Sequence, residues 1–490
     1  MTQLETSVGA GVSFALTAEQ RELRALAREF AEKEIRPKAA EYDEHSTHPA
    51  DVIAKAHELG LMNLHVPESL GGLGLPAFDG MLVGEELNWG CSGIGTSILA
   101  NGLGAGPVLL AGSDEQKELR ALAREFAAKE IRPKAAEYDE HQTHPADVVA
   151  KAHELGLMNL HLPESLGGPE LSAFDGMLVG EELNWGCSGI GTSIGANGLA
   201  AGPILIAGTD EQKREWLAPL LSEPILGCFG LSEPGAGSDV SGIQTTAVPR
   251  GGESVVNGSK MFITNAGRAS WIVCFASTDK SKGHRGLTAF VIPMDAEGVT
   301  IEKHLDKMGQ RATDTSAVAF QDVVVPAANR LGEEGDGFKI AMQTLDFTRP
   351  GTAVGAVGVA QAAYELAVDY AKERVQFGMP IAMNQGVSFL VADMAAEIEA
   401  ARLLTWQAAW MIDQGYGRKA TKYSSFAKRF AADTAMKVTT DAVQVFGGYG
   451  YIKEYPVEKL MRDAKLFQIY EGTSQIQRLV IAKEIFLGEG

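Results

Sequence analysis

A nearly verbatim internal repeat constrains this chain more than any other feature of its sequence. Residues 18–113 (copy 1) recur as residues 114–209 (copy 2), and roughly 82 of the 96 paired positions are identical. Everything after copy 2 occurs once. Two copies are too few for a solenoid, which needs at least three repeats to bury a continuous core. The chain therefore has two candidates for one docking surface, and we expect only one of them to occupy it.

The borders of the repeat indicate which copy is complete. The tripeptide Glu-Gln-Lys/Arg begins each copy and recurs at residues 211–213. From there the chain runs into Arg-Glu-Trp-Leu-Ala-Pro-Leu-Leu, a helical ending that copy 1 lacks. We interpret copy 2 as the complete domain and copy 1 as an extra unit. One difference points the other way, because copy 2 has GGPEL at residues 167–171 where copy 1 has GGLGL.

Composition and charge narrow the class of protein. A chain of 490 residues has room for about three domains. The net charge of −20 disfavours nucleic acids and anionic membranes as partners, because both attract clustered positive charge. We expect no transmembrane helix and no secretory signal, since no run of about 18 apolar residues and no basic leader stands out. The four cysteines form no CxxC pair, which favours reduced cytoplasmic thiols and no metal site.

The periodicity of apolar residues changes twice along the chain. Both copies show helical spacing, β-like runs rich in Val, Ile and Thr begin near Leu226, and helical spacing returns after Gly337. We predict a multidomain α and β protein. Its parts are an extra copy of the all-α N-terminal domain at 1–113, that domain at 114–225, a β-barrel-like middle domain at 226–335 and a C-terminal four-helix-type bundle at 336–490.

Two stretches in the β-like region are candidates for ligand contacts. The loop at residues 228–242, CFGLSEPGAGSDVSG, combines glycines that permit close backbone approach with the hydroxyls of Ser232 and Ser238. Taken alone, it is equally typical of a turn-rich loop between domains. Phe262 and Thr264 lie two positions apart and so share one face of a strand, as they also would in any half-buried strand.

Three stretches in the C-terminal region also permit both a functional and a purely structural interpretation. Arg374 and Phe377 in ERVQFG have the chemistry to hold a phosphate and a ring, but an arginine at a helix end also complements the helix dipole. Gly448 in QVFGGYG is also typical of a helix C-cap. Glu471 in QIYEGTSQIQRLV would act as a base if burial raised its pKa, but next to a helix start it also complements the dipole.

Taken together and in this order, these stretches resemble the acyl-CoA dehydrogenase family, with the closest likeness to its medium- and short-chain members. ELGLMNLHVPE, DKMGQRATDT, DFTRP and EYPVEKLMRDAK fit as well, and the likeness covers residues 114–490 plus the redundant copy. The resemblance implies bound FAD and an acyl-CoA substrate. It implies α,β-dehydrogenation of short- or medium-chain acyl-CoA to trans-2-enoyl-CoA.

The resemblance also implies residue roles. Glu471 matches the base that removes the α-proton while a β-hydride goes to flavin N5, and the DFTRP stretch offers no glutamate that would replace it. The implied cofactor contacts are Phe229, Leu231, Ser232, Gly237, Ser238, Phe262, Thr264, Arg374, Phe377, Gln385, Gln444, Gly447, Gly448, Thr473 and Gln475. The implied substrate contacts are Ser238, Asp346, Arg349, Tyr470, Gly472 and Gly195. At the floor of the acyl pocket, copy 1 has Leu99 where copy 2 has Gly195.

The resemblance implies a homotetramer in which Arg374 and Gln444 reach a cofactor across a subunit interface. It implies electron-transferring flavoprotein as the acceptor and a cytoplasmic location, or the mitochondrial matrix for a mature eukaryotic chain. Two alternatives stay open. One is an acyl-CoA oxidase-like flavoenzyme, because oxygen reactivity depends on flavin exposure. The other is a non-catalytic binding or assembly protein of the same fold, which the acidic charge and the intact Glu471 disfavour.

Overall fold

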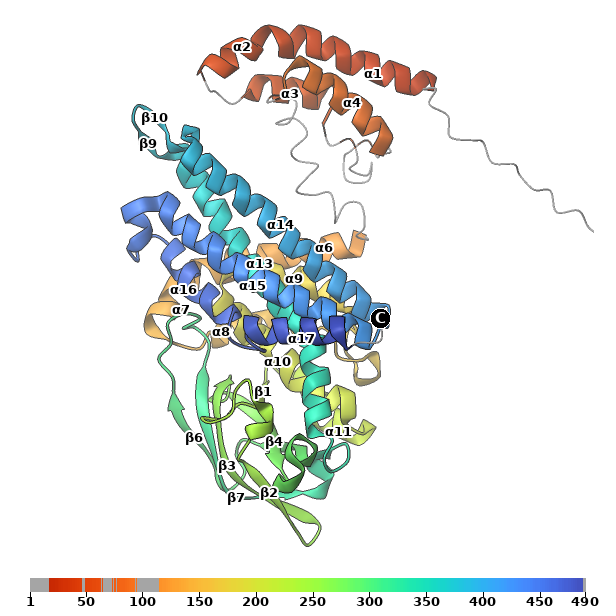
Figure 1. Ribbon diagram of the computed structural model, residues 1–490, viewed down its shortest axis with the longest axis vertical. Helices are drawn as coiled ribbons and strands as arrows, with labels where there is room; N and C mark the ends of the chain where they lie inside the picture. The colour runs from red at the N-terminus through yellow and green to blue at the C-terminus, as the bar shows by residue number, and fades with distance from the viewer. Residues whose placement is uncertain are drawn as a thin grey trace, which may run out of the picture. The chain divides into compact units, whose positions relative to one another are not determined.

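The computed structural model separates into two compact units, Met1–Glu118 and Leu119–Gly490, which we describe one at a time (Figure 1). The division lies inside a helix that begins copy 2. The structure describes residues 17–45, 49–62, 77–92 and 114–487, together with Leu64, Leu73, Leu75 and Ile94.

The first unit contains copy 1 and is helical in its described part. Its elements are α1 (Ala18–Phe30), a π-helical turn (Ala31–Ile35), α2 (Arg36–His45), α3 (Ala50–Glu58) and α4 (Ala77–Gly90). Thr17 begins α1 with a capping box, because its hydroxyl accepts from the Gln20 backbone N–H and the Gln20 side chain returns the bond. Helix α1 packs against α4 around a small core that includes Phe30 and Leu87.

The second unit begins with the helices of copy 2. They are α6 (Asp114–Phe126), a π-helical turn (Ala127–Ile131), a short 3₁₀ turn (Arg132–Lys134), α7 (Ala135–His141), α8 (Ala146–Glu154), α9 (Ala173–Gly186), α10 (Ser188–Ala207), α11 (Asp210–Trp216) and α12 (Pro219–Ser222). The π-helical turn recurs at the same place in both copies. Capping boxes also begin α9, at Ser172 and Asp175, and α11, at Thr209 and Gln212.

Helix α10 has a composition that the sequence analysis did not single out. By length and composition alone it is apolar enough to cross a membrane, contrary to the expectation that no such run exists. However, 56% of that window is buried inside the protein, where α10 packs against α13 and β1. Burial of this kind is typical of a core helix, and one such helix is weak evidence for a membrane span.

The middle of the chain forms an eight-stranded mixed sheet. Its strands are β1 (Leu226–Gly230), β2 (Thr246–Arg250), β3 (Glu253–Thr264), β4 (Ala269–Ser277), β5 (Leu287–Pro293), β6 (Val299–His304), β7 (Thr315–Pro326) and β8 (Arg330–Leu331). They lie in the order β6-β7-β3-β2-β4-β5-β8, and β1 pairs with β4 in parallel. The sequence of β4 explains its central place, because nearly every side chain of ASWIVCFAS is buried.

The C-terminal part is a helical bundle. It contains α13 (Gly337–Glu373), α14 (Gln385–Asp413), α15 (Arg418–Phe446), α16 (Val457–Phe467) and α17 (Ser474–Phe486), with a small hairpin of β9 (Val375–Gln376) and β10 (Met379–Pro380). Figure 1 shows α13, α14 and α15 running side by side, with the sheet beyond one end of α13. The predicted succession of helical, β and helical regions is therefore confirmed.

A row of glycines on α13 lets α9 of copy 2 approach very closely. Gly351, Gly355 and Gly358 are spaced at i, i+4 and i+7, so they share one face of the helix. A Cβ added at Gly358 would stand only 2.2 Å from the Glu181 carbonyl oxygen. A side chain larger than hydrogen at Gly358 would therefore push the two helices apart.

Polar contacts fix the register of α9 on the bundle. The Glu181 carboxylate accepts hydrogen bonds of 3.0 and 3.2 Å from Nε of Arg402 on α14. The Trp185 indole N–H donates to Glu365 on α13 at 2.7 Å. Both acidic groups thus meet a donor at the interface, so burying this part of α9 leaves neither without a partner.

Candidate active site

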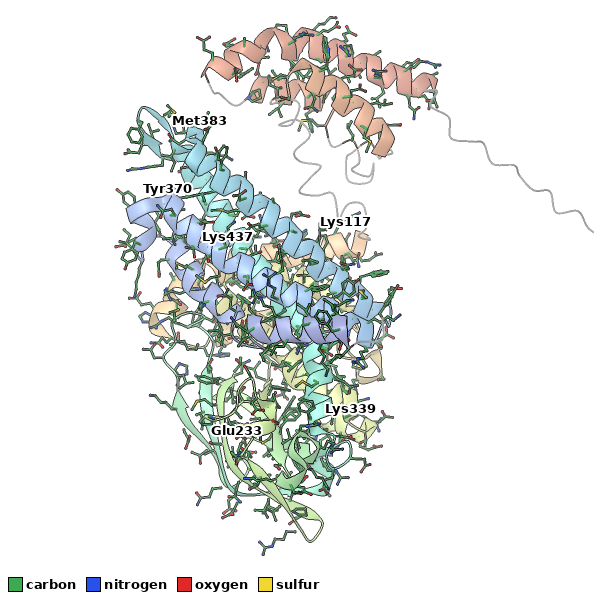
Figure 2. All side chains as sticks on the ribbon, in the orientation of Figure 1. Lys117, Glu233, Lys339, Tyr370, Met383 and Lys437 are labelled. Carbon is green, nitrogen blue, oxygen red and sulfur yellow. The ribbon has the colours of Figure 1, made fainter. Side chains whose placement is uncertain are left out.

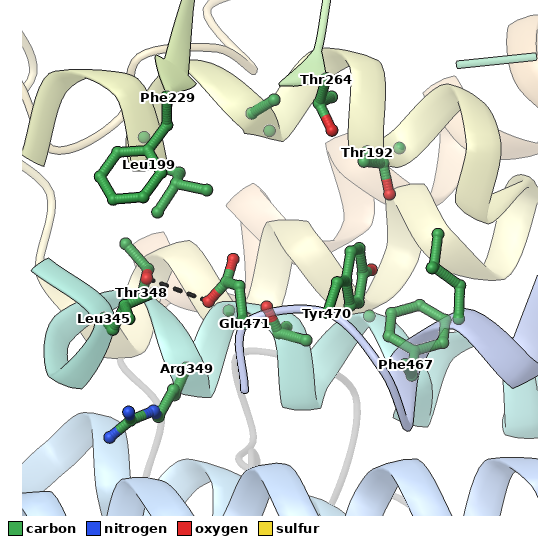
Figure 3. Close-up of a pocket in the computed structure, with 18 of the residues that line it drawn as sticks. Thr192, Leu199, Phe229, Thr264, Leu345, Thr348, Arg349, Phe467, Tyr470 and Glu471 are labelled. Carbon is green, nitrogen blue, oxygen red and sulfur yellow. Dashed lines mark hydrogen bonds between the residues drawn. The ribbon is translucent and has the colours of Figure 1, made fainter. Parts of the chain in front are cut away.

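A cavity of about 1120 Å³ lies where the three parts of the second unit meet. One wall comes from α9 and α10 of copy 2, a second from β1 and the loop that follows it, and a third from α13 and the segment between α16 and α17. Figure 3 shows Phe229, Leu199 and Thr264 facing Glu471 and Tyr470 across this space. The sequence brings these residues together only through the tertiary fold.

Glu471 faces the cavity from the turn between α16 and α17. Its backbone adopts a left-handed conformation with φ of 50°, and Gly472 follows with φ of 87°. The Thr348 hydroxyl on α13 donates to Glu471 Oε2 at 3.0 Å (Figure 3). The pKa of Glu471 is raised by burial, which outweighs the opposing hydrogen bonds and the nearby cations Lys428 and Arg349. A carboxylate with a raised pKa in a cavity is suited to accept a proton.

Two buried side chains donate hydrogen bonds to the backbone carbonyls of this turn. Lys428 on α15 is fully buried, and its Nζ donates to the Gly472 carbonyl at 2.6 Å. Gln477 on α17 donates through Nε2 to the carbonyls of Gly472 at 3.0 Å and of Glu471 at 3.2 Å. The sequence did not single out Lys428 or Gln477. A lysine on the apolar side of an alanine-rich helix was the available signal for Lys428.

A buried ion pair organises the glycine-rich loop on the opposite wall. The Glu233 carboxylate accepts from Lys260 Nζ at 2.8 Å and from the backbone N–H groups of Gln244 and Thr245 at 2.6 and 3.0 Å. Lys260 also donates to the Leu231 carbonyl at 3.2 Å. Neither charge reaches solvent, so the loop is fixed at both its ends. This pair was also not expected from the sequence.

The structure gathers most predicted site residues around the cavity. Those that line it are Glu471, Phe229, Leu231, Ser232, Gly237, Ser238, Phe262, Thr264, Thr473, Arg349, Tyr470, Gly472 and Gly195. Burial raises the pKa of Tyr470, so its hydroxyl keeps its proton. Asp346 does not line the cavity and instead pairs with Arg349 and accepts from the Thr421 hydroxyl. Leu99, the proposed counterpart of Gly195, lies outside the described residues.

A second set of predicted residues lies at a different place. Arg374, Gly447 and Gly448 line a smaller hollow of about 420 Å³ with Tyr370 and Tyr449. Figure 2 shows Tyr370 toward the β9–β10 end of the bundle, far from Glu233 in the sheet. The predicted cofactor contacts that line neither space are Phe377, Gln385, Gln444 and Gln475, and the predicted substrate contact Asp346 also lines neither.

Other reactive groups do not assemble into a site. Among the described residues, no group of three or more His, Cys, Asp or Glu side chains is placed to hold a metal ion. Cys187, Cys228 and Cys274 are buried free thiols, while Cys91 is partly accessible. Burial raises the pKa of the Cys274 thiol to about 11, so it is not a nucleophile near neutral pH.

Family models match nearly the whole chain. The N-terminal domain of acyl-CoA dehydrogenases matches twice, at residues 17–119 and 113–224, the middle domain matches residues 228–323 and the C-terminal domain matches residues 335–486. The chain is 47% identical to the short-chain specific mitochondrial acyl-CoA dehydrogenase of Bos taurus, over 74% of this chain and 88% of that one. It is 44% identical to an acyl-CoA dehydrogenase of Bacillus subtilis (strain 168), over 77% and 99% of the two chains.

Solved structures give the same result. The butyryl-CoA dehydrogenase of Megasphaera elsdenii is 44% identical, with a TM-score of 0.74 over 76% of this chain and 98% of that one. The described fold, the converging motifs and these matches agree. The chain belongs to the acyl-CoA dehydrogenase family, and it carries the family's N-terminal domain twice.

Proposed function

We propose that this protein is an FAD-dependent acyl-CoA dehydrogenase that converts short- or medium-chain acyl-CoA to trans-2-enoyl-CoA, with Glu471 as its base. The observation that carries the proposal is the Glu471 carboxylate, which faces a large cavity and has a pKa raised by burial. The opposite wall presents Ser232, Thr264 and Phe262, which the family resemblance assigns to the flavin. Relatives named as short-chain and butyryl-CoA dehydrogenases support the chain length.

The cavity wall fits a flavin. Phe262 is an exposed aromatic side chain that lines the cavity, which suits the face of a planar ring. A Cβ added at Gly237 would meet nothing within 4 Å, so the loop leaves room for a ligand beside its backbone. The hydroxyls of Ser232 and Thr264 supply polar contacts for the ring edge. Bound FAD would supply the acceptor for the hydride that leaves the β-carbon.

Residues of the chain itself would accept the α-proton and stabilise the charge that develops on the substrate. Glu471 accepts the α-proton at its carboxylate, and Thr348 holds that carboxylate in place. The α C–H bond is not acidic enough unless the thioester oxygen is hydrogen-bonded as enolate charge develops. We assign that role to the Glu471 backbone N–H, following the family resemblance. Glu471 would take the proton from the α-carbon, and FAD, when bound, would supply the acceptor for the β-hydride, so that the α,β double bond remains.

The split of predicted cofactor contacts supports a shared site. Arg374, Gly447 and Gly448 lie at a hollow separate from the main cavity. We propose that this hollow receives the ADP part of an FAD bound mainly by a neighbouring subunit in a homotetramer. Electron-transferring flavoprotein is the proposed acceptor. Comparing the rates at which oxygen and that flavoprotein reoxidise the reduced flavin separates this function from the oxidase alternative.

We further propose that copy 2 is the working N-terminal domain, within borders at residues 114–225, 226–335 and 336–490, and that residues 1–113 are surplus. Helices α4 and α9 have the same 14-residue sequence. Met177 is 5% exposed against the glycine row of α13, whereas its twin Met81 is 68% exposed. Trp185 is 8% exposed and Trp89 is 40% exposed. The face that docks in copy 2 is thus open to solvent in copy 1.

A pair of matched charge reversals tests this assignment. The Glu181 side chain is 1% exposed and binds Arg402, while its twin Glu85 is 66% exposed. Glu181→Lys would place two cations together in a buried site, which costs about 3–5 kcal/mol or more. We expect Glu181→Lys to lose bound FAD and thermal stability and Glu85→Lys to keep both. The reverse pattern would show that copy 1 occupies the docking surface.

One spectroscopic experiment tests the proposed function as a whole. The purified protein should be yellow, with about one FAD per chain, and anaerobic butyryl- to octanoyl-CoA should bleach its flavin absorbance. A colourless protein that takes up no FAD on reconstitution would overturn the enzyme proposal. Bleaching only by long-chain acyl-CoA would overturn the chain length alone.

A further inference from the structure

The turn that carries Glu471 adopts a conformation that needs support. Glu471 has a positive φ of 50°, which is uncommon for a residue with a Cβ, and Gly472 continues the left-handed turn. The carbonyl of Gly472 accepts from both Lys428 Nζ and Gln477 Nε2. The hydrogen bonds that fix the backbone at Gly472 therefore also fix the direction of the Glu471 side chain.

One of these two donors carries a charge. Among the described residues, no carboxylate lies within ion-pair distance of the Lys428 ammonium, so its positive charge is not neutralised at contact. Arg349, the other cation near Glu471, is paired with Asp346. Lys428 is fully buried, so water does not screen its charge from Glu471.

All elements packed around the base contribute to its electrostatics. Helix α13 faces Glu471 with the hydroxyls of Thr348 and Thr352 and with Arg349, and α15 faces it with Lys428. Within the turn itself, Tyr470 precedes the base; burial raises the pKa of Tyr470, and the Glu471 charge raises it further. Asp433 on α15 acts on Lys428 and is itself bound by the Gln468 amide and the Ser474 hydroxyl.

We propose that Lys428 is a positioning residue for the base, in two respects. Its hydrogen bond to the Gly472 carbonyl fixes the turn that aims Glu471 into the cavity. Its positive charge favours the ionised carboxylate and so sets the lowest pH at which Glu471 accepts a proton. This inference rests on the proposed role of Glu471 as the base.

The titration of Lys428 agrees with this geometry. Burial lowers the pKa of Lys428 to about 8, against the opposing effect of the Glu471 charge. The ammonium is therefore present at neutral pH, and it is lost at the alkaline end of the working range. Lys428 thus carries its positive charge beside Glu471 at neutral pH.

The chain offers a neutral counterpart for the test. Lys428→Gln removes the charge and keeps a donor, whereas Gln477→Ala removes a neutral donor to the same carbonyl and keeps the charge. Lys459→Gln is a control for losing a buried lysine, because Lys459 lies on α16 and pairs with Asp463 and Cys187 instead. The measurement is the rate of anaerobic flavin reduction by butyryl-CoA between pH 5 and 9, with FAD content as the check on folding.

We expect Lys428→Gln to move the acidic limb of the pH–rate profile upward by roughly one pH unit, because a nearby cation lowers the pKa of a carboxylate by about one to three units. Gln477→Ala should slow the reaction without moving the limb, and Lys459→Gln should leave the limb in place. The butyryl-CoA concentration for half-saturation should change little in each variant.

A Lys428→Gln protein with full FAD content and an unmoved limb would overturn the positioning role. If Lys428→Gln loses FAD, the Lys428→Arg variant provides the test instead. Because arginine keeps the positive charge, this variant must keep the acidic limb of the pH–rate profile at its wild-type pH. If the proposed dehydrogenase function itself is wrong, the result is different: butyryl-CoA does not reduce the wild-type flavin, or Glu471→Gln keeps the wild-type rate.

Discussion

The Thr348 hydroxyl donates to Oε2 of Glu471 at 3.0 Å, and this bond joins the turn before α17 to the 37-residue helix α13. The same helix carries the glycine row on which α9 docks. One element therefore positions both the proposed base and the domain that closes the cavity over it. The orientation of the carboxylate depends on the position of α13.

Replacing Thr348 by valine should slow flavin reduction about 2- to 10-fold, the value of one hydrogen bond of roughly 0.5–1.5 kcal/mol. The acidic limb of the pH–rate profile should also move upward, because the hydroxyl favours the ionised form of Glu471. Thr439→Val is the control, since that hydroxyl bonds only within α15. Equal slowing in both variants would assign the effect to lost packing.

Glu471→Gln should keep FAD and bind acyl-CoA yet lose turnover. Removing a general base typically costs about 10²–10⁴-fold or more in rate. Stopped-flow mixing with butyryl-CoA measures the reduction rate, and the absorbance change on binding shows that the site is intact. Turnover at the wild-type rate would place the base at another residue.

The stability of this variant should depend on pH in a defined direction. The pKa of Glu471 is raised above its ordinary value of 4.5, so the folded protein holds this proton at a pH where the unfolded chain has lost it. Ionising Glu471 therefore costs stability above its folded pKa, and the cost disappears as the pH falls toward 4.5. Glu471→Gln should have a higher Tm than the wild type at pH 8 and no advantage near pH 4.5. A lower Tm at pH 8 would contradict the raised pKa.

Arg374→Ala should lower FAD content while the protein remains a tetramer by light scattering. Arg418→Ala, which removes an exposed pair with Glu484, is the matched control. A sharper test co-assembles Arg374→Ala and Glu471→Gln subunits. If Arg374 serves the neighbour's cofactor, the mixed tetramers regain activity that neither variant has alone. No recovery in verified mixed tetramers would place Arg374 in its own subunit's site.

Thiol labelling should identify the docked copy without any substitution. Cys187 is buried and touches Lys459 Nζ, whereas its twin Cys91 is partly accessible. We expect iodoacetamide to modify Cys91 and spare Cys187, as read by mass spectrometry of tryptic peptides. Deleting residues 18–113 should leave FAD content and acyl-chain preference unchanged. Protection of Cys91, or a shift in preferred chain length after the deletion, would identify copy 1 as the working domain.

The sequence predicted the part of the site that motifs carry. Glu471, Ser232 and Thr264 come from separate stretches, and all three line one cavity, while their roles stay predictions. The supporting residues were not predictable in the same way. Lys260 is a lone cation in its strand and Lys428 stands next to Arg429 on its helix, and only the tertiary fold reveals that each meets a carbonyl or carboxylate inside the protein. The spacing of residues along one helix does not show which partner a neighbouring element brings to it.

The role of the glycine row is likewise evident only from the way α9 packs on it. From sequence alone, Gly351, Gly355 and Gly358 resemble weak points in a long helix, since glycine destabilises helix interiors. In the structure Gly358 is where the Glu181 and Trp185 backbone comes close to α13, while Gly355 faces the Phe467 and Asn184 side chains and Gly351 faces Met177. Prediction from periodicity located the helix but could not distinguish a contact face from a defect.

The glycine row on α13 receives one helix, α9, yet each chain encodes the sequence of that helix twice, as α4 and as α9. If copy 2 is the working domain, as proposed, selection on packing acts on α9 and not on α4. In descendants of this gene, substitutions should accumulate first at Met81, Glu85 and Trp89, while their twins stay fixed. The near identity of the two copies then dates the duplication as recent compared with the divergence of this chain from its relatives.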